Sequence, residues 1–250
     1  MRSIAFLIGI VLLAPAAAEA AEVRVLSVGS VQVAAKAIIA DFNKATGHAV
    51  TLHVVTPNRI PQQLASEPFD MLIASAPAME GHDKAGILRS GSRAPLARVG
   101  IGVIVREGAA LPDVSTPESF KRTLIAARTI VHGNPAVPNQ SGVVTMRILE
   151  KAGLLEMVKA KARAADLADG FALVAKGEIE LALFNTVELP AGVRLAGPVP
   201  APLADHTYFE TAVLAKGNAA EAAQAFIAAM TAPSARKVWE AALLEPYPYR

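Results

Sequence analysis

The sequence contains no cysteine, and this absence excludes disulfides, thiolate metal ligands and cysteine nucleophiles. Aromatic residues make up only 5% of the 250 residues, and the net charge is +2. Nucleic-acid binding usually needs a basic stripe interleaved with stacking rings. We therefore expect no nucleic-acid partner, and the length allows one large domain or two lobes, each with its own core.

Sequence signatures of catalysis and cofactor binding are also missing. The chain has no G-x-S-x-G, no Walker A loop, no H-E-x-x-H and no G-x-G-x-x-G. The histidines are dispersed and show no metal-ligand spacing, whereas a zinc site needs three or four convergent donors. We therefore expect no bound metal, no cofactor and no catalytic residue. The histidines concerned are His48, His53, His82, His132 and His206.

A targeting segment opens the chain. Arg2 precedes the apolar stretch 4–13, and Ala18-Glu19-Ala20 forms an A-x-A cleavage site. This pattern predicts a cleaved signal peptide over residues 1–21 and export to the periplasm. After it, no apolar run resembles a membrane span.

Short apolar runs then alternate with helix-like patterns. Strands are expected at 23–28, 49–55 and 69–75, with helices from Val31 to Thr46 and over 62–66 between them. This β-α-β-α-β order favours a parallel sheet with helices on its faces. Further strands are expected at 97–107, 128–134, 179–185 and 208–216, and helices at 142–152, 154–176, 219–230 and 234–244, with 192–202 as a connection.

Polar residues follow the expected strands. In such a sheet, ligands bind beyond the carboxyl ends of the strands, where helix N-termini supply N–H donors and a positive dipole. Arg59 is either an exposed loop arginine or a charge-assisted partner for an anionic ligand. Ser141-Gly142 either caps a helix or presents donors to a ligand. The positions concerned are Ser30, Thr56 to Arg59, Ser75, Asn134 to Gly142 and Asn185-Thr186.

Several motifs carry a resemblance to a known family. They are "VLSVGSVQVAAKAIIADFNKATGHAV", "QLASEPFDMLIASA", "IVHGNPAVPNQSG" and the closing "AEAAQAFIAAMTAPSARKVWEAALLEP". With these motifs the chain resembles the periplasmic molybdate-binding proteins, within the type II solute-binding proteins of ABC importers. The resemblance covers essentially the whole mature chain.

The resemblance implies where a ligand binds. The family's first serine falls on Ser30, its second falls in Thr56-Pro57, and its tyrosine falls on Asn185. Arg59 is an addition, so the ligand is either a molybdate-like oxyanion or a small carboxylate. The expected ligand-binding residues are Ser30, Thr56, Asn58, Arg59, Gln140, Ser141, Gly142, Leu167 and Asn185.

The resemblance also implies an α/β architecture of two lobes, each a mixed or parallel sheet flanked by helices, with the ligand cleft between them. The lobes would comprise residues 22–98 plus 203–250, and residues 99–202. The implied partner is the membrane permease of an ABC importer, and the implied state is a monomer. Two alternatives remain: a ligand-binding module for a sensory receptor, and an exported enzyme, for which Ser30 lacks an obvious histidine partner.

Overall fold

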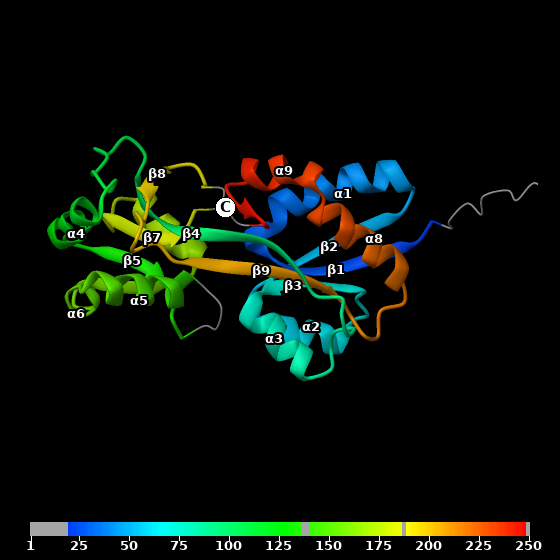
Figure 1. The fold of residues 1–250 in the computed structure, drawn as a ribbon. Helices are drawn as coiled ribbons and strands as arrows, with labels where there is room; N and C mark the ends of the chain where they lie inside the picture. The colour runs from blue at the N-terminus through cyan, green and yellow to red at the C-terminus, as the bar shows by residue number, and fades with distance from the viewer. Residues whose placement is uncertain (1–19, 137–140, 187–188, 249–250) are drawn as a thin grey trace, which may run out of the picture.

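The computed structural model describes residues 20–136, 141–186 and 189–248. Most of the predicted signal peptide, and Gln140 of the predicted site, lie outside these residues. Figure 1 shows an elongated molecule with two lobes, which confirms the predicted two-lobed α/β class. Among the described residues, no helix is long and apolar enough to cross a membrane.

The first lobe begins with consecutive β-α units. Strand β1 lies between β2 and β3 and is parallel to both, with Val23 opposite Val50 and Val25 opposite Met71. Gly47 ends α1 in the left-handed region at φ +74°, where glycine avoids the steric cost of a side chain. The elements are β1 (Glu22–Val28), η1 (Gly29–Val31), α1 (Gln32–Thr46), β2 (Ala49–Val55), η2 (Pro57–Arg59), α2 (Ile60–Ser66), β3 (Met71–Ser75) and α3 (Ala76–Lys84).

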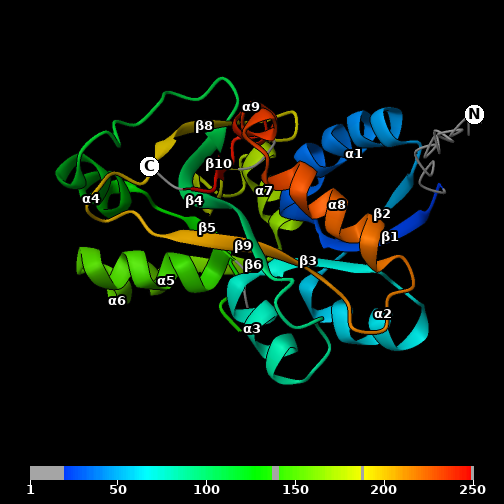
Figure 2. The same cartoon turned by 45° about the vertical axis from the view of Figure 1, so that its right-hand side comes forward.

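Two long strands, β4 (Ala94–Arg106) and β9 (His206–Val213), run antiparallel between the lobes. Figures 1 and 2 show both strands passing from one lobe into the other. Along β4, Val99 packs in the first lobe's core and Ile101 packs in the second lobe's core. Gly100 and Gly102 lie within this strand, on either side of Ile101.

The second lobe extends the sheet in the order β4-β7-β5-β6, and β5 is parallel to both β6 and β7. Strand β8 pairs with β4 off this path. The elements are α4 (Pro117–Ala126), β5 (Ile130–Gly133), α5 (Ser141–Ala152), α6 (Leu155–Lys159), β6 (Ala162–Ala165), α7 (Leu167–Ala175), β7 (Leu181–Asn185) and β8 (Val193–Pro198).

Two predictions for this lobe are wrong. Residues 154–176 are not one helical stretch, because β6 interrupts them and pairs with β5. Its Ala-Arg-Ala-Ala sequence favours a helix, and pairing at the sheet edge overrides that weak preference. Residues 192–202 are not only a connection either, since β8 occupies their first half. Their glycines and prolines are typical of loops, and the Val-Arg-Leu run between them is too short to predict a strand.

The chain closes on the first lobe with α8 (Ala220–Thr231), η3 (Pro233–Ala235), α9 (Arg236–Ala241) and β10 (Glu245–Pro246). The buried carboxylate of Asp70 fixes the entry to α8. It accepts hydrogen bonds from the backbone N–H groups of Arg24 (2.8 Å), Asn218 (2.8 Å) and Ala219 (3.0 Å). Asp70 thereby joins the start of β3 to β1 and to the closing helices.

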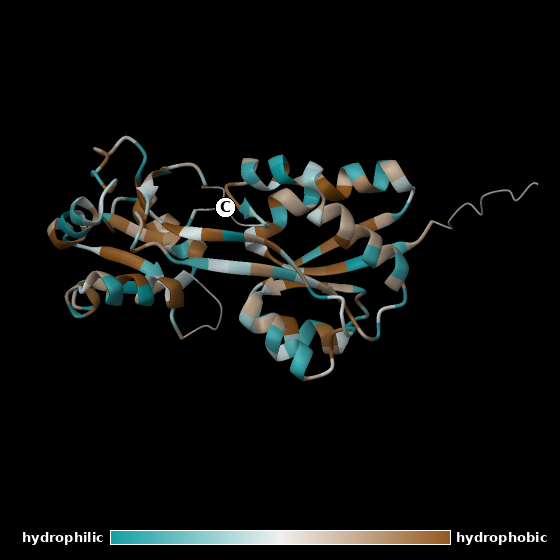
Figure 3. Cartoon of the chain, viewed as in Figure 1, coloured by the Kyte–Doolittle hydropathy of each residue, from teal (hydrophilic) through white to brown (hydrophobic). Residues whose placement is uncertain are grey.

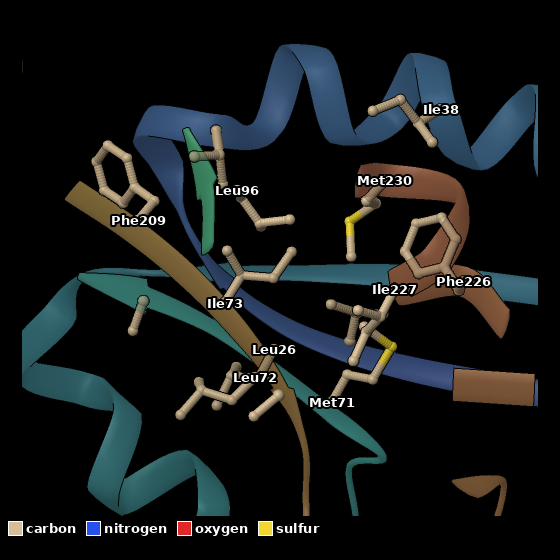
Figure 4. Close-up of a cluster of buried hydrophobic side chains, with 14 of the residues drawn as sticks. Leu26, Ile38, Met71, Leu72, Ile73, Leu96, Phe209, Phe226, Ile227 and Met230 are labelled. Carbon is tan, nitrogen blue, oxygen red and sulfur yellow. The ribbon is translucent and has the colours of Figure 1, made fainter. Parts of the chain in front are cut away.

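Each lobe has its own apolar core. Figure 4 shows the first, where Met71 of β3 lies beside Ile227 of α8, while Leu26 lies beside its strand partner Leu72. In the second lobe, alternation along the strands divides the core, with Leu183 on one face and Phe184 on the other. Figure 3 shows apolar strands between helices with polar outer faces. The residue bounds expected for the lobes stay a prediction.

Candidate functional site

A cavity of about 620 Å³ lies at the carboxyl ends of β1, β2 and β3 and is lined by residues of both lobes. This volume falls in the range of sites for small organic molecules. We call its two sides the first-lobe wall and the second-lobe wall. The first-lobe wall comprises Val28, Gly29, Ser30, Gln32, Val33, Val54, Val55, Thr56, Pro57, Ile60, Ala74, Ser75, Ala78, Phe209 and Ala242; the second-lobe wall comprises Ser141, Asp166, Leu167, Ala168, Asp169 and Asn185.

The first-lobe wall is mostly apolar and carries no charged side chain. Val33 and Val54 are 43% and 39% exposed, and both face this cavity. Covering exposed apolar side chains of this size with the carbon skeleton of a ligand, or with the opposite wall, is favourable because it removes apolar surface from water. The wall therefore suits a ligand with an organic framework.

Helix starts converge on the cavity from both walls. The first residues of η1 with α1, of η2 with α2, and of α3, α5 and α7 lie at or beside the lining. The N-cap residues of η1, η2, α3 and α7 make no side-chain cap hydrogen bond. The first N–H groups of a helix have no partner within the helix, so they can bind an anion, except at Pro57 of η2 and Pro77 of α3, which have no N–H.

Two buried polar side chains in the cavity lack partners. Ser75 is 4% exposed and Asn185 is 7% exposed. Their Oγ and Oδ1 atoms make no hydrogen bond within the structure. A buried polar atom without a partner costs about 1–3 kcal/mol, and a bound ligand or water removes that cost. Both positions therefore indicate groups that a ligand completes.

The second-lobe wall carries two carboxylates. Asp166 occupies the N-cap position of α7 and Asp169 lies in its first turn. Neither side chain makes an ion pair or hydrogen bond with another described residue, and both are exposed to solvent. Among the described residues that line the cavity there is no lysine, arginine or histidine. An anionic ligand therefore meets backbone donors and hydroxyls here rather than cations.

Glycines hold the second-lobe wall in place. A side chain on Gly142 would collide with the backbone of Gly133 and Asn134, so α5 begins directly against the end of β5. Likewise, a side chain on Gly170 would collide with the ring of Phe184, so α7 lies close against β7. These contacts place Ser141 and the start of α7 at the cavity.

Comparison with known proteins shows the family of the chain. A family model for bacterial extracellular solute-binding proteins matches residues 23–242. The chain belongs to this family. The match confirms the prediction, made from the sequence motifs, that the chain is a solute-binding protein.

Individual relatives of this solute-binding protein have different ligands in their names. It is 31% identical over 233 residues to an aconitate isomerase of a Pseudomonas species, covering 90% of this chain and 87% of that protein. It is 29% identical over 239 residues to the molybdate-binding protein ModA of Azotobacter vinelandii, covering 90% of each. A solved periplasmic molybdate-binding protein of A. vinelandii has the same fold, with a TM-score of 0.71 and 20% identity over 89% of this chain and 98% of that one.

The structure brings part of the expected site together. Ser30, Thr56, Ser141, Leu167 and Asn185 line the cavity of the solute-binding protein. Gly142 lies just behind it, against β5. Gln140 lies outside the described residues.

Two expected residues, Asn58 and Arg59, do not line the cavity. Asn58 accepts a hydrogen bond from the Thr56 hydroxyl at 2.6 Å. The exposed Arg59 guanidinium donates to the Gln62 side-chain oxygen at 2.8 Å, one turn along η2 and α2. The local helical geometry brings Gln62 within hydrogen-bond distance of Arg59.

The expected site omitted Ser75, Gln32, Asp166 and Asp169. Ser75 is the last residue of β3, and its place at the end of a strand is the sequence signal for it, since no motif distinguishes it. Asp166 and Asp169 belonged to the stretch assigned to one helix. Once β6 is recognised, Asp166 directly follows a strand and starts a helix, which is the position where ligand-binding residues occur.

A second, smaller cavity of about 110 Å³ lies behind Ser75, beside β9 and α5. Thr207 also lines it, and the Thr207 hydroxyl has no partner. His206 lies on the same strand, and burial lowers the pKa of its ring, helped by the nearby charge of Arg98. The cavity is large enough for water, which would satisfy the Thr207 hydroxyl. Within the described residues, no group of His, Asp or Glu side chains is placed to hold a metal ion.

Proposed function

We propose that this solute-binding protein captures a small organic anion, a carboxylate, in the periplasm and delivers it to the membrane permease of an ABC importer. The observation that carries this proposal is the convergence of uncapped helix starts on a single cavity with a largely apolar wall. The helix starts supply donors and partial positive charge for a carboxylate. The apolar wall suits the carbon skeleton.

The cavity favours a carboxylate over molybdate. A tetrahedral oxyanion that loses its water needs hydrogen-bond donors on all sides. At the positions where the resemblance places the family's second serine and its tyrosine, this chain has Thr56-Pro57 and Asn185, and the exposed Val33 and Val54 add apolar surface to the first-lobe wall. The relative named for aconitate, a small tricarboxylate, supports the same choice.

Titration calorimetry on the mature protein tests the proposal. The panel contains molybdate, tungstate, sulfate, phosphate and mono-, di- and tricarboxylates. We expect at least one carboxylate to bind, and to raise the melting temperature as RT ln(1 + [L]/Kd) requires. Binding of molybdate or tungstate alone would contradict the choice of a carboxylate.

The transport step rests on closure of the two lobes. A ligand that contacts both walls favours the closed form by its differential affinity for that form. Small-angle scattering with and without the carboxylate that binds would show a smaller radius of gyration on binding. N-terminal sequencing of exported protein would test cleavage after residue 20 or 21.

A second candidate function is isomerisation of an unsaturated carboxylate. The 31% identity with an aconitate isomerase supports it, as do the unpaired carboxylates of Asp166 and Asp169 on the cavity wall. A carboxylate can remove a proton from one carbon and return it to another, which moves a double bond without any cofactor. Proton NMR of cis-aconitate with catalytic amounts of protein, in deuterium oxide, would show conversion and deuterium incorporation. Absence of both would remove this candidate.

A further inference from the structure

The two walls of the cavity offer opposite partners to a ligand. The first-lobe wall presents donors: the free N–H groups at the starts of η1 and α3, and the hydroxyls of Ser30 and Ser75. The second-lobe wall presents, besides the starts of α5 and α7, acceptors that are charged or buried: the carboxylates of Asp166 and Asp169, and the Oδ1 atom of Asn185. No described basic side chain in the lining neutralises these acceptors.

We propose that the ligand is bipolar: its carboxylate faces the first-lobe wall, and a hydrogen-bond donor, either a hydroxyl or an ammonium group, faces Asp166, Asp169 and Asn185. This inference rests on the proposed capture of a carboxylate and narrows the class of carboxylate. It assigns Asp166 and Asp169 the role of choosing between ligands of similar size.

Asn185 provides the independent observation. Asn185 is only 7% exposed, and no donor among the described residues forms a hydrogen bond with its Oδ1 atom. A buried amide oxygen cannot be satisfied by another acceptor such as a carboxylate oxygen. Asn185 lines the cavity on the same wall as the two aspartates, so a donor carried by the ligand would satisfy this oxygen.

Electrostatics points the same way. Two unpaired carboxylates repel a second anionic group, and they repel it more strongly when closure of the lobes removes water. A hydroxyl or ammonium group instead gains charge-assisted hydrogen bonds, which are stronger than neutral ones. A ligand with an anion at one end and a donor at the other therefore fits both walls at once.

Matched ligands test the proposal by calorimetry on the mature protein. One set is succinate, malate and aspartate, and a second is tricarballylate and citrate. Within at least one set, we expect the member with a donor to bind about tenfold more tightly than the member without one. Preference for malate identifies a hydroxyl as the donor, and preference for aspartate identifies an ammonium group.

Single variants identify the residues responsible. Asp166→Asn and Asp169→Asn should each weaken the donor-bearing ligand about tenfold and leave succinate or tricarballylate unchanged or tighter. Asp41→Asn is the matched control, because Asp41 is exposed on α1, outside the cavity. It should behave as the wild type.

The outcomes separate the two proposals. If a carboxylate binds but its donor-free counterpart binds equally well, or if both aspartate variants bind every ligand as the wild type does, the bipolar ligand is wrong while carboxylate capture stands. If no carboxylate in the panel binds, or if only molybdate binds, carboxylate capture fails and the bipolar ligand fails with it.

Discussion

The two walls of the cavity differ in chemistry and in what holds them. The first-lobe wall is uncharged and follows three consecutive β-α units, whose strands lie side by side in one sheet. The second-lobe wall is polar and acidic, and depends on close packing at Gly133, Gly142 and Gly170, where a side chain would collide with neighbouring atoms. The first wall is therefore suited to hold the anion and the second to orient the rest of the ligand. The second wall is also the more sensitive to small changes in packing.

The largest effect is expected for Gly142→Ala, which tests the packing of the second wall. The added methyl would collide with the backbone of Gly133 and Asn134, which cannot move as a flexible side chain can. We expect the free energy of unfolding to fall by about 3 kcal/mol, as for severe overpacking. Chemical denaturation at constant pH measures this loss.

Gly81→Ala is the matched control for that variant. Gly81 lies in α3, its φ is not positive, and no atom lies within 4 Å of the added methyl. Alanine should stabilise the helix there by roughly 0.5–1 kcal/mol. Equal effects of the two substitutions would show that close packing does not hold the second wall.

Ser75→Ala tests the first wall, with a smaller expected effect. The Ser75 hydroxyl has no partner in the free protein, so its loss should leave the free energy of unfolding unchanged or raise it by about 1 kcal/mol. Affinity for the best carboxylate should fall about tenfold, because one donor to the anion is lost. Ser66→Ala, at an exposed site at the end of α2, should change neither quantity appreciably. Unchanged affinity in Ser75→Ala would remove Ser75 from the site.

Strand β9, which passes between the lobes, begins at His206, and this residue gives a prediction for the pH dependence of stability. Burial lowers the pKa of His206, with Arg98 adding to the effect, while Glu245 and Asp205 oppose it. The folded protein thus favours the neutral ring, whereas the unfolded chain binds a proton near the ordinary pKa of 6.5. The free energy of unfolding should therefore be highest above pH 6.5 and should decrease as the pH falls from 6.5 through the lower pKa of the folded protein. Denaturation from pH 7.5 to pH 5.5 should show this decline, and His206→Gln should reduce it. An identical decline in the variant would contradict the prediction; His82, whose pKa is also lowered by burial, contributes separately.

The difference between the two walls also explains which residues of the candidate site can be predicted from the sequence. Around β1, β2 and β3, apolar runs and helical spacing follow one another without interruption, so the position of Ser30 at a helix start was predictable. In the second lobe, the short strand β6 consists of Ala-Arg-Ala-Ala, and only its pairing with β5 makes it a strand. Because long-range pairing decides this segment, no local pattern could place Asp166 and Asp169 at the cavity. Ser75 needed the structure for another reason, since its burial and missing partner are properties of the packed state.

The smallest effect is expected for Arg59→Ala, which tests whether the first wall is truly without charge. The sequence predicts Arg59 as a partner for an anion. In the structure its guanidinium is exposed and donates a hydrogen bond to the side-chain oxygen of Gln62 at 2.8 Å. An exposed hydrogen bond of this kind contributes little, so unfolding free energy should change by less than about 0.5 kcal/mol. Carboxylate affinity should change less than twofold at physiological salt, where distant exposed charges are screened beyond roughly 8 Å. A tenfold loss of affinity would mean that Arg59 reaches the anion when the lobes close, and that the first wall recognises charge with a cation as well as with helix starts.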